Sequence, residues 1–270
     1  MSTIPRMNLN SGEVTMIQPA QTRQAEPSLA AHAQAALRAA ALEVRVLSTE
    51  EAFVELAVDW NRVHGECETA SVFNTWLWQY TWWQVYGGGR PLRILVAMDG
   101  DTPVGIVPLH IRATRAMGAT VRLLRLIGTG GDTHPDDLGA VLASHCAQAA
   151  ADALAEAALA LPGWDVLSLD DMDPRSPFPQ ALARAAAGRG LACEEGVSQR
   201  IPYVALPRSW DAYLASLDSK RRGRFRKMPR RLTENFRTRF FVWDDPAGID
   251  AVVDRLAHLH RKRWLESGQS

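Results

Sequence analysis

Apolar and polar residues alternate along several short segments of the chain, as they do in strands buried on one face. LEVRVLS at residues 42–48 is the first such segment. RILVAMDG and PVGIVPLHIRATR, within residues 93–115, are typical of a hairpin that turns at Gly100-Asp101. TVRLLRLIG at residues 120–128 is the predicted third strand of this meander. Since proline cannot donate to a strand ladder, Pro108 predicts an edge or a bulge.

Apolar residues at helical spacing predict helices around these strands. A capping box of Ser48 and Glu51 predicts the start of the first helix, and its buried face would comprise Phe53, Leu56, Trp60 and Val63. The aromatic segment FNTWLWQYTWWQVYG favours a helix packed into a domain over a base-stacking platform, because little positive charge lies near it. An Ala-rich helix at 145–161 is predicted to cross over to a fourth strand, DVLSLDDM. A helix at 179–189 then precedes a strand-like QRIPYVAL.

The C-terminal part of the chain predicts helices separated by one strand. Ser209 is expected to cap a helix that continues into a basic stretch. Pro229 should push Met228 out of the helical region and start a new helix. RTRFFVW is the predicted strand, and Asp245-Pro246 should open the last helix. The buried face of that helix is predicted to contain Ile249, Val252, Val253, Leu256 and Leu259.

Composition and charge narrow the class of protein. The chain has 270 residues, 47% of them apolar, and its formal net charge is zero. We predict an α/β (α+β) fold with a mixed, mostly antiparallel sheet flanked by helices. Residues 1–41 are interpreted as a flexible Ala-rich tail. No apolar run reaches the roughly 18 residues that a membrane span needs. Three scattered cysteines lack metal-ligand spacing, so we assign no metal site and expect a reducing cytoplasm.

The basic stretch SKRRGRFRKMPRRLTENFRTRF, residues 219–240, carries ten Lys and Arg and one Glu, so its charge is +9. As a helix it would have a narrow apolar stripe of Phe225, Met228, Leu232 and Phe236. Three interpretations remain open: a solvated helix docked on a domain, contact with a phosphorylated cofactor or substrate, and nucleic-acid binding, which the lack of a recognition motif disfavours. The candidate anion ligands are Arg222, Arg226, Lys227 and Arg230.

The segment GTGGDTHPDDLG, residues 128–139, is the strongest loop signal. It carries four candidate substrate-binding residues, Asp132, His134, Asp136 and Asp137. His134 with a carboxylate could act as a general base, or these side chains could hold a divalent metal. Asp and Gly are equally typical of turns and caps. RAMGAT, residues 115–120, is interpreted as a hairpin turn, because a phosphate-gripping loop should open a helix. The pattern assigns no catalytic residue.

Five segments in order resemble one family: VFNTWLWQYTWWQVYG, RILVAMDGDTPVGIVPLHI, LRLIGTGGDTHPDDLG, SWDAYLASLDSKRRGRFRKMPRRL and LHRKRWLESG. They are similar to the GNAT-type acyltransferases of the CelD/BioF2-like group, which are related to the Fem-type aminoacyl transferases. The resemblance runs from about Leu42 to the end of the sequence. It implies a first GNAT-like domain at 42–206 and the beginning of a second, incomplete one at 207–270.

The resemblance also implies an activity. The expected reaction is N-acyl transfer from acetyl-CoA or another acyl-CoA to a small-molecule amine, such as a sugar or a cell-envelope precursor. A dimer or a completing partner chain would finish the second domain. One alternative is a non-catalytic module that binds RNA or an anionic glycan through residues 219–240. The other is an inert chain with exposed apolar surface around Phe240, Phe241 and Val242.

Overall fold

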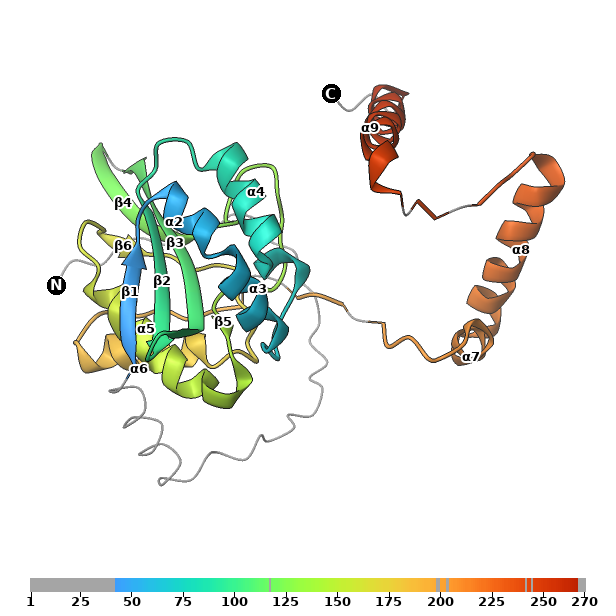
Figure 1. Ribbon diagram of the computed structural model, residues 1–270. Helices are drawn as coiled ribbons and strands as arrows, with labels where there is room; N and C mark the ends of the chain where they lie inside the picture. Colours follow the sequence, from blue (N-terminus) through green and yellow to red (C-terminus); the bar gives the residue numbers. More distant parts are fainter. Residues whose placement is uncertain are drawn as a thin grey trace. The chain divides into compact units, whose positions relative to one another are not determined.

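The protein is described by a computed structural model that covers residues 42–116, 118–197, 200–202, 204–240, 242–243 and 245–266. The chain divides between Ile201 and Pro202 into two compact units. Figure 1 shows a sheet with helices in the first unit and helices alone in the second. The predicted tail, residues 1–41, lies outside the described residues.

One mixed sheet organises the first unit. Within the described residues its strands are β1 (Glu43–Leu47), β2 (Leu92–Asp99), β3 (Thr102–Ala116), β4 (Ala119–Leu126), β5 (Val141–Leu142) and β6 (Val166–Leu167). The order is β1-β2-β3-β4-β6, and β5 pairs with β3. These pairings are antiparallel except for β4 with β6, which are parallel and joined by a helical crossover. The predicted fold class is therefore confirmed: mixed α/β, with a mostly antiparallel sheet flanked by helices.

Helices cover both faces of this sheet (Figure 1). One group comprises α2 (Glu50–Glu55), α3 (Ala57–Gly65), the short η1 (Val72–Asn74) and α4 (Trp76–Tyr86). The other comprises η2 (Ser144–Cys146), α5 (Ala147–Ala160) and α6 (Phe178–Gly188). His110 on β3 contacts Trp82 of α4, whereas the Cα of Gly105 faces Ala150 of α5. Because strand residues alternate between faces, these contacts place α4 and α5 on opposite sides.

The core forms where both helical layers meet the sheet. Phe53, Trp60 and Phe178 are fully buried, and the predicted face of the first helical segment is confirmed. That segment is divided at Leu56 into α2 and α3. Its cap is Thr49, one residue after the predicted Ser48, because Thr49 Oγ1 accepts a hydrogen bond from Ala52 N at 3.2 Å.

Pro108 lies in a central strand, so the prediction of an edge or a bulge at this residue is wrong. It pairs with Ile94 of β2, and its carbonyl accepts a hydrogen bond from Ile127 N at 2.9 Å. The bulge lies instead between Ala97 and Met98. Proline is tolerated here because the N–H that it lacks would point toward the end of β4. Beyond this point β3 pairs with β5, so β4 and β5 follow the same edge of β3, with residues 127–140 between them.

The second unit contains α7 (Trp210–Ser216), α8 (Ser219–Asn235), η3 (Pro246–Gly248) and α9 (Ile249–Glu266). The caps predicted at Ser209 and Asp245 are confirmed. The predicted break at Met228 is wrong, since α8 continues through Pro229. Proline removes one backbone donor. A cap from Asp218 and an ion pair further along support the helix on both sides of it.

Two strands predicted near the second unit do not form. Residues 200–202 and 204–206, and residues 237–240 and 242–243, are described without strand pairing. Strand-like apolar residues alone do not make a strand, because the backbone also needs a partner strand for its hydrogen bonds. Phe240 and Val242 are exposed, as expected for uncovered apolar surface, and Phe241 lies outside the described residues.

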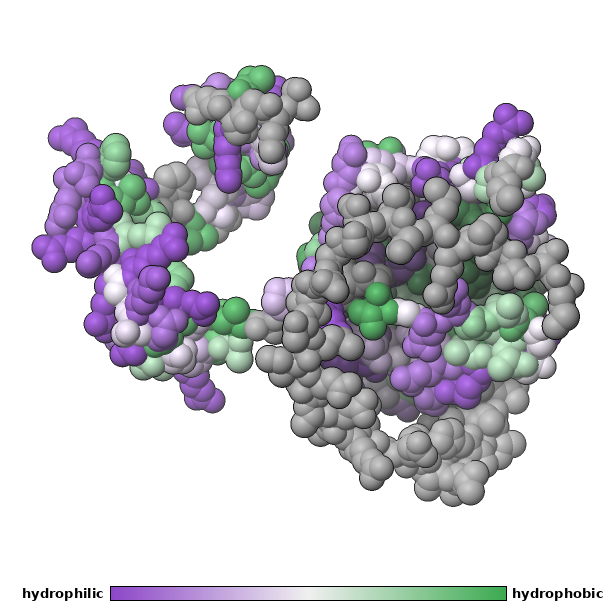
Figure 2. All heavy atoms as spheres, turned by 180° about the vertical axis from the view of Figure 1, so that it is seen from behind, coloured by the Kyte–Doolittle hydropathy of each residue, from purple (hydrophilic) through white to green (hydrophobic). Residues whose placement is uncertain are grey.

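Exposed apolar side chains are also found on the helices of the second unit. Figure 2 shows green hydrophobic residues between purple hydrophilic ones there. The stripe of α8 is exposed, and so are four of the residues predicted to be buried on α9: Ile249, Val253, Leu256 and Leu259. The spacing of these residues fits a helix. Within the second unit these side chains are not buried as predicted, because no described residue of that unit covers them.

Candidate functional site

The glycine-rich segment that was predicted as a functional loop lies between β4 and β5, which pair with the same edge of β3. It packs against α4. Trp82 Nε1 donates a hydrogen bond to Thr133 Oγ1 at 3.1 Å. Gly128 has φ 101°, and a Cβ there would lie 2.9 Å from both Leu138 and Trp78. Gly131 has φ 73° and faces Tyr86 in the same way. The glycines therefore allow the backbone to approach the aromatic helix closely.

The four candidate residues of this loop do not form a metal cluster. Asp132 and His134 are exposed, whereas Asp136 and Asp137 are half-buried. Among the described residues, no group of three or more His, Cys, Asp or Glu is arranged to hold a metal ion. His134 is thus exposed while Asp137 is half-buried, and the contacts of Asp137 can be described in detail.

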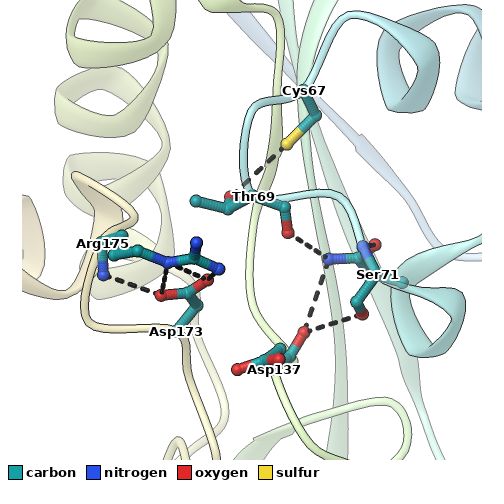
Figure 3. A network of polar contacts seen from close by, with 7 residues as sticks. Cys67, Thr69, Ser71, Asp137, Asp173 and Arg175 are labelled. Atoms are coloured by element: carbon teal, nitrogen blue, oxygen red, sulfur yellow. Dashed lines mark hydrogen bonds and ion pairs between the residues drawn. The ribbon is translucent and has the colours of Figure 1, made fainter. Parts of the chain in front are cut away.

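Asp137 is held in a left-handed conformation, φ 55°, by a polar network (Figure 3). Its carbonyl accepts hydrogen bonds from Ser71 Oγ at 3.2 Å and from Asn74 Nδ2 at 3.5 Å. Asn74 is itself buried, and its Oδ1 accepts from Ser71 N at 2.8 Å. The segment after α3 therefore fixes the backbone at Asp137, which leaves the carboxylate to interact elsewhere.

The carboxylate of Asp137 lies close enough to Asp173 and Arg175, on the segment after β6, to be affected by their charges. Burial and the negative charge of Asp173 raise the pKa of Asp137, and Arg175 partly opposes them. Burial also tends to raise the pKa of Asp173. The hydrogen bonds from Arg175 outweigh it, and the pKa of Asp173 is lowered. Asp173 thus stays ionised, with Arg175 Nη2 at 2.6 Å, while Asp137 holds a proton more readily than an ordinary aspartate does.

A second site, absent from the sequence prediction, is formed by three arginines around His110. His110 on β3 pairs across the strands with Arg125 on β4, and Arg112 lies two residues further on the same face of β3. Arg90, which precedes β2, places Nη1 3.4 Å from His110 Nε2. We call Arg90, Arg112 and Arg125 the arginine cluster.

His110 is fully buried beneath α4. Its ring lies 5.7 Å from the ring of Trp82 and 6.2 Å from that of Trp83, measured between centroids. Burial and the charges of the arginine cluster lower its pKa to about 3. His110 is therefore neutral at neutral pH. Arginine is only a donor, so Nε2 accepts and the proton is on Nδ1, a buried atom with no hydrogen-bond partner among the described residues.

The arginine cluster has little neutralising charge nearby. Arg125 Nη2 lies 2.6 Å from Asp170 Oδ2, while its Nε is buried without a partner among the described residues. Burial and then the charges of Arg112 and Arg125 lower the pKa of Arg90, whose guanidinium lies 5.9 Å from the centre of the Trp82 ring. The three guanidinium groups therefore repel one another, and the ion pair with Asp170 compensates the charge of one of them.

The sequence held only a weak signal for this cluster. His110 and Arg112 are polar residues with period 2 inside an apolar strand, a pattern that also fits an ordinary solvent face. Their neighbours Arg90 and Arg125 come from other elements, so the cluster depends on the strand register. The available clue to the cluster was that each of three neighbouring segments contains an arginine.

The candidate anion ligands of the basic stretch all lie on α8. Arg222, Arg226 and Arg230 are four residues apart and share one side of the helix, and Lys227 adjoins them. Arg222 Nη2 donates to Leu217 O at 2.9 Å, and Arg230 Nε lies 2.7 Å from Glu234 Oε1. Arg226 and Lys227 are exposed. These residues form a solvent-facing cationic surface within their own unit.

No family model and no curated protein matches this chain. None of the helices in the described ranges is long and apolar enough to cross a membrane.

Proposed function

We propose that the chain is an acyl-CoA-dependent N-acyltransferase that acts on a small-molecule amine in the cytoplasm. The observation that supports this proposal is the parallel pair β4–β6 in an otherwise antiparallel sheet. In open α/β sheets ligands bind beyond the carboxyl ends of parallel strands. The resemblance of the ordered sequence segments to the GNAT-type acyltransferases supports the same activity.

The hydrogen-bond ladder between these two strands is short. β4 and β6 pair at Leu123–Leu124 with Val166–Leu167, and Ser168 N donates to Leu124 O at 3.0 Å. The ladder then stops within the described residues, and the next backbone bond is from Leu138 N to Asp171 O at 2.8 Å. We propose that amide groups of an acyl-CoA extend this ladder by hydrogen bonding to strand backbone beyond Leu124 and Ser168.

In the proposed reaction the amine nitrogen attacks the thioester carbonyl carbon, a C–N bond forms, and the C–S bond breaks to release the thiol. Backbone N–H groups near the end of β4 would stabilise the negative charge on the carbonyl oxygen. Asp137 is the proposed general base, because its raised pKa favours acceptance of the proton lost by the amine. Its carboxylate would also attract a cationic acceptor before deprotonation.

Calorimetric titration of acetyl-CoA into the 270-residue chain tests the donor half of this proposal. Saturable binding near one to one, displaced by free coenzyme A, is the expected result. No heat and no thermal shift from a folded chain would reject the proposal.

Replacement of one carboxylate tests the acceptor half. With a panel of amino sugars and diamines as acceptors, Asp137→Asn should lower the rate of thiol release by about 100-fold or more, because general-base catalysis is lost. Acetyl-CoA binding should stay unchanged. Asp132→Asn, which removes an exposed carboxylate of the same loop, is the control and should retain activity. Equal rates in the two variants would rule out Asp137 as the base.

A further inference from the structure

We propose that the arginine cluster binds a phosphate dianion, a function that does not depend on acyl transfer. Three guanidinium groups surround His110, and Asp170 is the carboxylate paired with one of them. The local charge is thus +2. A phosphate dianion would neutralise this charge, whereas a carboxylate would neutralise half of it.

The hydrogen-bonding groups of the site favour the same ligand. Arginine forks match phosphate oxygens in a two-bond geometry, and such bonds are stronger when both partners are charged. Buried polar atoms without a partner among the described residues are found on all three adjoining segments: His110 Nδ1 on β3, Arg125 Nε on β4, and Thr129 Oγ1 on the loop that follows. These three atoms are enclosed, so the direct contacts to an anion would come from the half-buried guanidinium groups of Arg90 and Arg112. Buried polar atoms without partners are rare in folded proteins.

The loop backbone passes close to the guanidinium of Arg112. Gly130 has φ 89°, and a Cβ placed on it would lie 3.5 Å from Arg112 Nη1. The backbone at Gly130 therefore passes beside this guanidinium without a side chain to cover it. Arg90 and Arg112 are half-buried, so the site is recessed but reachable from solvent. A recessed site of this kind suits a single phosphate group better than a nucleic-acid backbone.

The first experiment is calorimetric titration of inorganic phosphate into the full chain, in a phosphate-free buffer of constant ionic strength. Saturable binding near one to one is expected. Arg112→Gln should weaken it about tenfold or more, because a charge-assisted contact is lost. Arg115→Gln removes an exposed cation from the same strand and should leave binding unchanged. No binding by the wild-type chain, or equal loss in the two variants, would overturn the proposal.

A second variant guards against misfolding as the cause of lost binding. Arg90→Gln removes a cation from a different segment and should weaken phosphate binding in the same way, with an unchanged circular dichroism spectrum. Both variants should be as stable as the wild-type chain without phosphate, because repulsion within the cluster is relieved. A folded Arg90→Gln variant with wild-type affinity would contradict a shared site.

Competition identifies the source of the phosphate. If coenzyme A displaces inorganic phosphate, and Arg112→Gln weakens both, the bound group is a phosphate of the acyl donor. If phosphate binds and coenzyme A does not displace it, the site takes free phosphate or a phosphorylated acceptor. Both results support the phosphate site. Phosphate binding without acetyl-CoA binding would reject the proposed transferase and leave this inference standing.

Discussion

Lowering the pH should destabilise the first unit through His110, the buried imidazole beneath α4. Its pKa is lowered from an ordinary value of 6.5 to about 3 in the folded chain. Between these two values the unfolded chain binds more protons than the folded one. The free energy of unfolding must therefore fall as the pH falls through this window. At neutral pH the residue is neutral in both states, and the effect is absent.

The magnitude follows from the two pKa values. Between about pH 7.5 and pH 5, protonation of the unfolded histidine should lower the free energy of unfolding by about 2 kcal/mol. The folded residue contributes nothing in this interval, because its own pKa lies well below it. The raised pKa of Asp137 acts in the opposite direction, and it acts equally in a variant that lacks the histidine.

Urea unfolding followed by tryptophan fluorescence measures this difference, in the wild-type chain and in His110→Gln at both pH values. A glutamine oxygen can still accept from Arg90, so the variant keeps a neutral acceptor without a titrating ring. The variant should lose about 2 kcal/mol less than the wild-type chain on acidification. Phosphate must be left out, since bound anion would add its own dependence on pH. Equal losses in the two proteins would refute the reasoning.

Two further predictions concern the loop packed on α4, and both are checked by thermal and urea unfolding. Gly128→Ala should destabilise the first unit by about 2 kcal/mol or more, because the new Cβ meets Leu138 and Trp78 at 2.9 Å and alanine is strained at φ 101°. Wild-type stability in this variant would mean that the close approach is not needed. Thr133→Val should cost about 1 to 2 kcal/mol, since Trp82 Nε1 loses its acceptor. An unchanged unfolding midpoint would show that this bond adds no net stability.

The sequence predicted the meander well: β1 from alternating apolar residues, and β2 and β3 from apolar runs on either side of a turn at Gly100-Asp101. Helices cover both faces of the sheet, so β2 and most of β3 are buried nearly throughout rather than at every second residue. Apolar, strand-like residues were a poor guide at 237–240 and 242–243, since no described strand pairs with them. Burial was likewise predicted from spacing on α9, although spacing defines only a face and another element must cover it.

The candidate sites were predictable only in part. The loop that contains Asp137 was found from its glycines and aspartates, but the distinction between Asp137 and Asp132 depends on contacts from distant segments. The arginine cluster depends on pairing between β3 and β4, which brings His110 opposite Arg125. Neither residue is unusual in its local sequence, so periodicity could not reveal the site. Pro108 was a usable clue, since its missing donor marks where β4 ends.

Because β4 and β5 pair with the same edge of β3, the protein can accept some sequence changes between them during evolution. β4 and β5 each form their own hydrogen bonds with β3, and Pro108 lies opposite the end of β4, where the loop begins. The residues between these strands can therefore vary without a change of strand register, but only where their side chains are exposed, as at Asp132 and His134. In directed evolution, libraries confined to these two positions should alter ligand preference with less loss of folded protein than libraries in the strands.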